Sequence, residues 1–258
     1  MHGQALTHAE WLDHVPSLLS ECATAWGLTP GHGYAPGAAG YATRVGLPDG
    51  TPAVLKLVYP DRESEQEADA LERWDGDGAV RLLARDDARH ALLLERCEPG
   101  AFLSGSPHAL DVLIGLLPRL WKDPAGFHTL EEEAAHWLDV GVDDLAAGWI
   151  RELAPSQGEL VLVHQDLHGD NVLSAEREPW LAIDPKPLAA EREFAVAPIV
   201  RSPELGHSRR EVVHRLDRLS AELGLDRERA RGWTIAQTLA WSEGNRIESH
   251  LEVVEWLR

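Results

Sequence analysis

The chain has 258 residues, of which 44% are hydrophobic and 26% charged, a composition typical of globular proteins that bury a core of ordinary size. Its 43 acidic residues outnumber the 24 lysines and arginines, and the resulting net charge of −19 disfavours nucleic acid and anionic membranes as partners. The excess acid either serves solubility or helps to form a pocket for a cationic substrate. The sequence has neither a run of about 18 apolar residues nor a leader-like N-terminus, so we expect a cytoplasmic protein.

The first part of the chain predicts a small lobe of mixed helix and antiparallel sheet. Apolar residues recur at a spacing near 3.6 from His8 to Trp26, which predicts an amphipathic helix that ends at Gly27. Pro48-Asp49-Gly50 predicts a turn between two strands. The other elements expected here are a strand at Ala53–Val58, a helix at Glu63–Trp74, and strands at Ala79–Leu83 and Ala91–Glu95.

The second part predicts a mainly helical lobe. The change of character falls between Cys97 and Gly100, so we expect an N-terminal lobe at 1–97 and a C-terminal lobe at 98–258. Cys22 and Cys97 are too few for a disulfide framework. The predicted helices are Pro107–Trp121, Leu130–Ala147, Ala146–Leu153, Arg209–Leu223 and Asp226–Trp241, and the predicted short strands are Leu160–Val163, Val172–Leu173 and Trp180–Asp184.

The most informative stretch is HQDLHGDN, from His164 to Asn171, which fits the catalytic-loop pattern H-x-D-L-x-x-x-N. An aspartate on such a loop can accept the proton of an attacking hydroxyl, and an asparagine five residues later can offer an amide oxygen to a metal ion. We assign these roles to Asp166 as catalytic base and to Asn171 as metal ligand. We expect His164 to hold the loop by hydrogen bonds, and Gln165 has no assigned role.

A second oxygen ligand is expected from Asp184. The strands Val172–Leu173 and Trp180–Ile183 predict an antiparallel hairpin, which brings Asn171 and Asp184 to the same end. Mg²⁺ prefers oxygen donors, and one neutral amide holds it weakly. The pattern therefore predicts a magnesium site at Asn171 and Asp184.

A lysine and a glutamate in the first lobe complete the set of candidate catalytic and cofactor-binding residues. Lys56 sits in the apolar run AVLKLV, as does the strand lysine that holds the ATP phosphates in kinases. Helix periodicity places Glu67 on the same face as Leu71 and Trp74, so we expect Glu67 to pair with Lys56, with Glu63 as the alternative.

Together these residues and their order resemble the aminoglycoside phosphotransferase superfamily, and within it the streptomycin 6-kinase and hydroxyurea phosphotransferase group. The resemblance runs from about Gly33 to Trp241, and VHQDLHGDNVL and WLAIDPKPL are its most specific stretches. It implies an α+β, protein-kinase-like two-lobed fold with ATP and Mg²⁺ as cofactors. It also implies that ATP binds at the hinge residues Glu95, Arg96 and Cys97, and that the phosphoryl acceptor is a hydroxyl of a small molecule, such as an aminoglycoside or hydroxyurea.

The chain departs from the kinase pattern in three places. Gly31, Gly33, Gly37 and Gly40 do not form a G-x-G-x-x-G loop, and Ile183-Asp184-Pro185 stands where protein kinases have D-F-G. Relatives often carry an aspartate in the segment that is Phe194-Ala195-Val196 here, so the role of that aspartate must be met differently.

Acceptor contacts are the least determined part of the site. Four acidic residues, Glu191, Glu193, Glu204 and Glu243, are the candidates, with Trp233 and Asn245 nearby, and solvated or packing roles are their alternative. We expect a cationic acceptor and a monomer, because Asp166 and the net charge attract cations and no exposed apolar stripe stands out.

Two rival hypotheses remain open at this point. His164 and His168 with Asp166 and Asp170 could form a zinc or manganese site of a hydrolase, because imidazole and carboxylate suit these metals. A catalytically silent binding protein with the same fold is the other, and a kinase of a sugar or another metabolite would share all the residues above.

Overall fold

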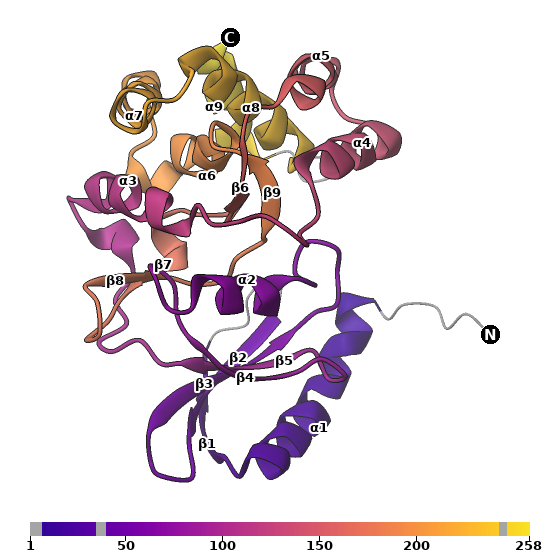
Figure 1. Cartoon of the computed structure of the whole chain (residues 1–258), viewed down its shortest axis with the longest axis vertical. Coiled ribbons are helices and arrows are strands. Elements are labelled where there is room, and N and C mark those ends of the chain that lie inside the picture. The colour runs from indigo at the N-terminus through magenta and orange to yellow at the C-terminus, as the bar shows by residue number, and fades with distance from the viewer. Residues whose placement is uncertain (1–6, 35–39, 243–246) are drawn as a thin grey trace. The chain divides into compact units, whose positions relative to one another are not determined.

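The computed structural model describes residues 7–34, 40–242 and 247–258. The chain divides into two compact units, Met1–Glu98 and Pro99–Arg258, so the boundary lies one residue after the predicted position (Figure 1). Glu243 and Asn245, two of the candidate acceptor contacts, lie outside the described residues, as does Gly37. No helix in the described part of the chain is long and apolar enough to cross a membrane.

The first unit is built on a five-stranded antiparallel sheet with the order β1-β2-β3-β5-β4. The turn at Pro48-Asp49-Gly50 joins β2 to β3, as predicted, and Gly50 has a φ of 88°, which glycine adopts without strain. The elements of this unit are α1 (His8–Trp26), β1 (Thr29–Gly33), β2 (Gly40–Gly46), β3 (Pro52–Val58), α2 (Glu67–Trp74), β4 (Leu82–Asp86) and β5 (Ala91–Glu95).

Side-chain alternation along β3 gives its two faces different partners. Ala53, Leu55 and Leu57 join the core that packs against Trp11 and other residues of α1. Successive side chains of a strand point to opposite faces, so Lys56 points away from α1. The ribbon accordingly has α1 and α2 on opposite sides of this sheet (Figure 1). The alternation of side chains along β3 thereby directs Lys56 toward α2.

The second unit joins helices to two short antiparallel ribbons. β6 (Leu160–Val163) pairs with β9 (Leu188–Glu191), and β7 (Val172–Ser174) pairs with β8 (Trp180–Ala182). The helix α8 (Arg227–Ala240) is mostly buried and packs on several of the other helices. The remaining helices are α3 (Ala109–Leu120), α4 (Leu130–Val140), α5 (Asp144–Leu153), α6 (Ala197–Arg201), α7 (Arg209–Leu223) and α9 (Glu248–Leu257), and the 3-10 turns are η1 (Leu103–Gly105), η2 (Ala154–Ser156), η3 (Gly169–Asn171), η4 (Phe194–Val196) and η5 (Pro203–Leu205).

Three predicted boundaries were wrong, each for a local reason. The helix predicted from Leu130 to Ala147 ends at Val140, because Gly141 has a φ of 92° and Asp143 then caps α5 by accepting from the Leu145 amide at 2.8 Å. The helix predicted from Glu63 begins at Glu67, because Ser64 is held in a turn by Asp61. The strand predicted at Ala79–Leu83 lies three residues later, at Leu82–Asp86.

Candidate active site

The predicted catalytic loop connects β6 to β7, so both of its ends are fixed by strand pairing. Within it, the Asp166 amide donates to the His164 carbonyl at 2.8 Å, and Gln165 between them adopts a φ of 62°. A non-glycine residue rarely adopts this left-handed conformation, and such residues are concentrated at functional sites. The tight turn at Gln165 leaves the Asp166 side chain 20% exposed.

The two carboxylate oxygens of Asp166 face different groups. The Asn171 Nδ2 donates to the Asp166 carbonyl at 2.8 Å and lies 3.3 Å from Oδ2. Oδ1 lies 3.8 Å from the Arg201 Nη2 and 4.0 Å from the His168 Nε2. Because the amide nitrogen of Asn171 is turned toward Asp166, its amide oxygen is the atom that remains to bind a cation.

Asn171 and Asp184 lie at the same end of the β7–β8 hairpin, as the strand pattern predicts. Val172 pairs with Ala182 in register, and the Ile183 amide donates to the Asn171 carbonyl at 2.9 Å. Asp184 then leaves the hairpin with a φ of 58°. An amide and a carboxylate that supply only oxygen fit the donor preference of Mg²⁺ better than that of zinc.

His164 has the structural surroundings expected of a loop anchor. Its ring is 3% exposed, and its Nε2 donates to the Ile183 carbonyl at 2.9 Å, while its own carbonyl accepts from the Lys186 amide at 3.0 Å. Burial lowers the pKa of His164 to about 4, so the ring is neutral at physiological pH. The bonds join the start of the catalytic loop to the segment that carries Asp184.

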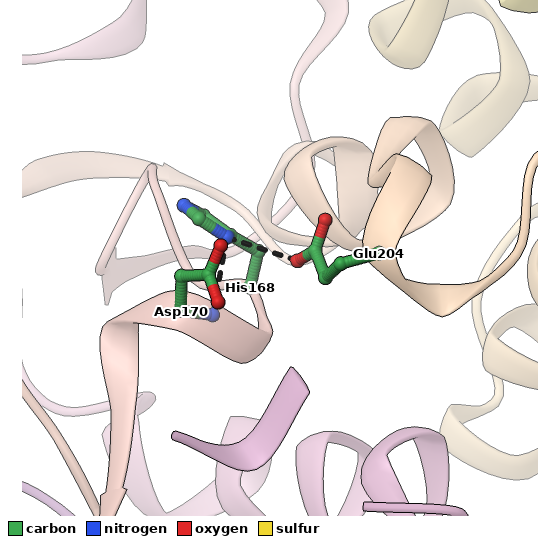
Figure 2. Close-up of side chains that lie close together, drawn as sticks. All are labelled: His168, Asp170 and Glu204. Carbon is green, nitrogen blue, oxygen red and sulfur yellow. Dashed lines mark hydrogen bonds and ion pairs between the residues drawn. The ribbon is translucent and has the colours of Figure 1, made fainter. Parts of the chain in front are cut away.

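His168, Asp170 and Glu204 are gathered beside the same loop (Figure 2), with ligand atoms within 4.8 Å of one another. His168 Nδ1 donates to Glu204 Oε1 at 3.0 Å, and the Gly169 amide donates to the same oxygen at 3.0 Å. Burial acts to raise the pKa of Glu204, but bonds from His168 and Ser202 outweigh it and lower the pKa to about 2. Burial likewise acts to lower the pKa of His168, and Glu204 and Asp166 outweigh it, so that pKa is raised.

The main contact in this cluster is the ion pair between His168 and Glu204. Its geometry supports neither the metal site of a hydrolase nor a direct contact between Glu204 and an acceptor. The set suggested by the sequence, His164 with His168, Asp166 and Asp170, is not the set that gathers here. Glu204 has one oxygen engaged by two loop donors, which favours a supporting role over direct contact with an acceptor.

Lys56 and Glu67 form a buried ion pair in the first unit. The Lys56 Nζ lies 2.6 and 2.7 Å from the two carboxylate oxygens of Glu67, and the residues are 8% and 1% exposed. The helix periodicity that selected Glu67 therefore gave the correct partner. A lysine held this way keeps its ammonium group at a fixed place on β3.

The predicted hinge residues lie at the end of the first unit. Glu95 is the last residue of β5, and its amide donates to the Arg81 carbonyl at 3.0 Å. Arg96 pairs with Glu98 at 2.8 Å, and Cys97 is half-buried. Among the glycines before β3, Gly40 has no room for a side chain, because a Cβ would lie 2.6 Å from the Leu57 carbonyl oxygen.

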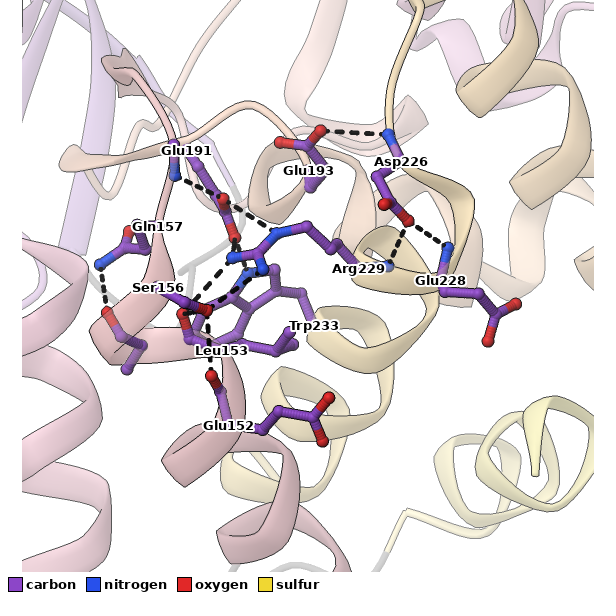
Figure 3. A network of polar contacts seen from close by, with 12 residues as sticks. Glu152, Leu153, Ser156, Gln157, Glu191, Glu193, Asp226, Glu228, Arg229 and Trp233 are labelled. Atoms are coloured by element: carbon purple, nitrogen blue, oxygen red, sulfur yellow. Dashed lines mark hydrogen bonds and ion pairs between the residues drawn. The ribbon is translucent and has the colours of Figure 1, made fainter.

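Glu191 and Glu193 take part in a polar network of the second unit (Figure 3). Glu191 is 2% exposed; it accepts from Arg229 at 2.6 Å, from the Trp233 indole and from the Gly158 amide at 3.0 Å. Glu193 accepts from the Asp226 amide at 3.1 Å. These contacts favour the packing alternative for Glu191 and Trp233, since their polar groups already have partners inside the unit.

Sequence reasoning missed two residues that the fold brings to the loop, Arg201 and Gln237. Arg201 is 5% exposed and Gln237 is fully buried. A basic residue in the otherwise apolar helix α6, and an amide in the buried middle of α8, were the available signals, because such groups are rarely buried without a partner.

The sequence model of the aminoglycoside/hydroxyurea antibiotic resistance kinases matches residues 26–245. A streptomycin 6-kinase from Streptomyces griseus is 40% identical over 253 residues, covering 89% of this chain and 82% of that protein. A hydroxyurea phosphotransferase from Kitasatospora aureofaciens is 40% identical over 252 residues, covering 89% and 73%.

Among solved structures, the choline kinase LicA from Streptococcus pneumoniae superimposes with a TM-score of 0.69 at 15% identity, covering 95% of this chain and 99% of that one. At this identity the likeness concerns the fold alone. It confirms the predicted α+β fold, with an antiparallel sheet in the first part and helices in the second.

Proposed function

Because the chain belongs to the aminoglycoside/hydroxyurea antibiotic resistance kinase family, and is therefore a phosphotransferase, we propose that it transfers the γ-phosphoryl group of ATP to a hydroxyl of a streptomycin-like aminoglycoside or of hydroxyurea. The observation that carries the proposal is the arrangement around Asp166. The partly exposed carboxylate of Asp166 lies beside Asn171, which stands at the same end of the β7–β8 hairpin as Asp184. This arrangement suits a hydroxyl acceptor and a divalent ion together.

In the proposed reaction, Asp166 orients the acceptor hydroxyl and takes its proton as the oxygen attacks phosphorus. Asn171 and Asp184 would hold Mg²⁺, which neutralises charge on the phosphates when it is bound. Lys56, fixed by Glu67, binds the phosphates of ATP in the first unit. Glu95, Arg96 and Cys97 bind the adenine through their backbone.

The nature of the acceptor follows from charge and from the relatives. The net charge of −19 and the carboxylate of Asp166 favour a cationic acceptor, such as the guanidinium-bearing streptomycin. Hydroxyurea is neutral, so it would depend on hydrogen bonds instead. We further propose that the protein acts in the cytoplasm as a monomer.

Coupled ADP release with Mg-ATP tests this function. Wild type, Asp166→Asn and the control Asp139→Asn, which alters an exposed carboxylate on α4, would be assayed with streptomycin, hydroxyurea, kanamycin and glucose. We expect turnover with streptomycin or hydroxyurea in wild type and control, and a rate lower by roughly 10²- to 10⁴-fold in Asp166→Asn.

Two other outcomes would contradict the proposal. Turnover with glucose alone would indicate a metabolite kinase. A thermal shift with Mg-ATP and no turnover on any acceptor would favour the silent binding protein.

A further inference from the structure

The segment from Val200 to Gly206, which comprises the end of α6 and the start of the connection to α7, lies against the catalytic loop. Arg201 at its start faces the carboxylate of Asp166, and Glu204 faces His168 and Gly169. Neither residue belongs to the H-x-D-L-x-x-x-N motif. Charges of opposite sign therefore support two points of the loop from a single short segment.

Arg201 is held from three directions. Its Nη1 donates to Gln237 Oε1 at 2.6 Å, its guanidinium lies 4.7 Å from the centre of the Trp241 ring, and its Nη2 lies 3.8 Å from Asp166 Oδ1. A planar guanidinium that is stacked and hydrogen-bonded has little freedom to turn. Its charge is thus fixed beside one oxygen of Asp166.

Gln237 connects the same guanidinium to the loop backbone. Its Oε1 accepts from Arg201, and its Nε2 donates to the Gln165 carbonyl at 3.2 Å. Gln165 is the residue with the left-handed conformation, so this bond supports the turn that presents Asp166. The loop backbone is thereby held from α8.

Glu204 holds the other half of the loop. One oxygen accepts from the His168 ring and from the Gly169 amide, both at 3.0 Å. On its other side, Gly169 packs on η1 so closely that a Cβ would lie 2.8 Å from the Ser104 Cα. The loop is therefore confined between Glu204 and the backbone of η1.

Arg215 makes the supporting segment rigid. This residue on α7 is 2% exposed, and its guanidinium donates to the carbonyls of Val200 at 2.9 Å, Leu205 at 3.0 Å and Gly206 at 2.7 Å. The three bonds tie both ends of the segment to one side chain, so Arg201 and Glu204 keep a constant separation.

We propose that Arg201 and Glu204 are positioning residues of the catalytic loop, Arg201 for the carboxylate of Asp166 and Glu204 for the turn at His168 and Gly169. The inference rests on the proposed function in so far as Asp166 is the catalytic base. The two roles also predict how rigidly the catalytic loop is held, and this rigidity can be measured in the absence of turnover.

Amide hydrogen exchange of the whole 258-residue chain is the first test. Glu204→Met keeps the side-chain length and removes the acceptor, so the Gly169 amide should exchange roughly 10- to 100-fold faster, as expected for the loss of a charge-assisted bond. Arg201→Met should speed exchange across residues 164–171. The control variants, Glu222→Met and Arg218→Met, alter an exposed ion pair on α7 and should leave this loop unchanged.

Kinetics provide the second test, with the acceptor that wild type uses. We expect kcat to fall roughly 10- to 100-fold in Arg201→Met and Glu204→Met, with the KM for Mg-ATP within about threefold of wild type. Arg201→Lys keeps the charge and loses the planar fork, and Glu204→Gln keeps an acceptor, so both should recover part of kcat. A variant that is only destabilised in general would have a lower Tm, but it would not combine a lower kcat with an unchanged KM for Mg-ATP.

Unchanged exchange in residues 164–171 for both methionine variants would overturn the proposal whether or not wild type shows turnover. Wild-type turnover with an unchanged kcat in Arg201→Met and Glu204→Met would also overturn it. Absence of wild-type turnover together with faster exchange would contradict the proposed function and leave the positioning roles standing.

Discussion

The ion pair between Lys56 and Glu67 is the clearest case at the scale of single residues. Both side chains are buried, so removal of either one leaves the other charge without its partner in a place that water reaches poorly. The pair is therefore expected to matter for stability as well as for the proposed binding of ATP.

We predict that Glu67→Leu lowers the free energy of unfolding by about 3 to 5 kcal/mol. The double variant Lys56→Met/Glu67→Leu should recover much of that loss, because it leaves no buried charge. Urea unfolding of wild type, both single variants and the double variant gives the coupling energy. Equal losses in Glu67→Leu and the double variant would mean that the pair contributes little beyond packing.

Gly169 allows the catalytic loop to approach η1. Gly169→Ala would place a methyl group 2.8 Å from the Ser104 Cα and 2.9 Å from its nitrogen, so backbone must move. We predict a loss of about 1 to 3 kcal/mol in stability and a lower kcat. Gly105→Ala on η1 is the matched control, because nothing lies within 4 Å of its added Cβ. Similar effects in both variants would contradict this explanation.

Residues with a fixed spacing could be found from sequence, and residues brought in by tertiary packing could not. Asp166, Asn171 and Asp184 lie within one loop and one hairpin, so local rules place them together. Arg201 and Gln237 reach the loop through α6 and α8, from positions 36 residues apart, and no local pattern relates them. Their contacts depend on how these helices pack.

At the scale of elements, long helices with regular apolar spacing were predicted well, as were the short strands β5 and β6, but other elements were missed. The bounds of α1 and α7 agree with the prediction, whereas β9, α6 and α9 were missed. β9 and α6 are short and buried on all sides, so neither shows the alternation or the 3.6-residue period that reveals a longer element.

Glu191 anchors β9 to α8 and to the turn before β6. Its contacts come from two segments: Arg229 and Trp233 belong to α8, and Gly158 belongs to the turn. We predict that Glu191→Ala lowers the free energy of unfolding by about 3 to 5 kcal/mol, because it leaves the Arg229 charge without this partner. Glu193→Ala, which removes one bond to the Asp226 amide, should cost only about 1 kcal/mol in the same urea titration. A smaller loss in Glu191→Ala than in Glu193→Ala would contradict this assignment.

At the scale of the whole molecule, the buried His164 and the half-buried His250 should make the protein sensitive to acid. Burial is the main cause that lowers the pKa of His164 and of His250 to about 4, below the ordinary value of 6.5. Between pH 6.5 and 4 the unfolded chain therefore takes up protons that the folded protein does not, so stability falls as the pH falls through this window.

Each histidine should contribute a slope of about 1.4 kcal/mol per pH unit inside that window and none above it. Chemical unfolding at pH 7.5, 6.5, 5.5 and 4.5 measures the slope. His250→Asn should reduce it, whereas the exposed control His108→Gln should not. A slope that His250→Asn leaves unchanged would exclude His250 as its source.

Lysine is rare in this chain, and this makes Lys56 a useful target for chemical labelling. Of the 24 basic residues only Lys56, Lys122 and Lys186 are lysines, and arginine side chains do not react with ordinary acylating reagents. An amine-reactive analogue of ATP can therefore form few adducts on this protein, and a single peptide map would resolve each of them. Attachment at Lys56 would label the first unit at one defined residue. The labelled peptide could then be recognised even in a mixture with proteins that are rich in lysine.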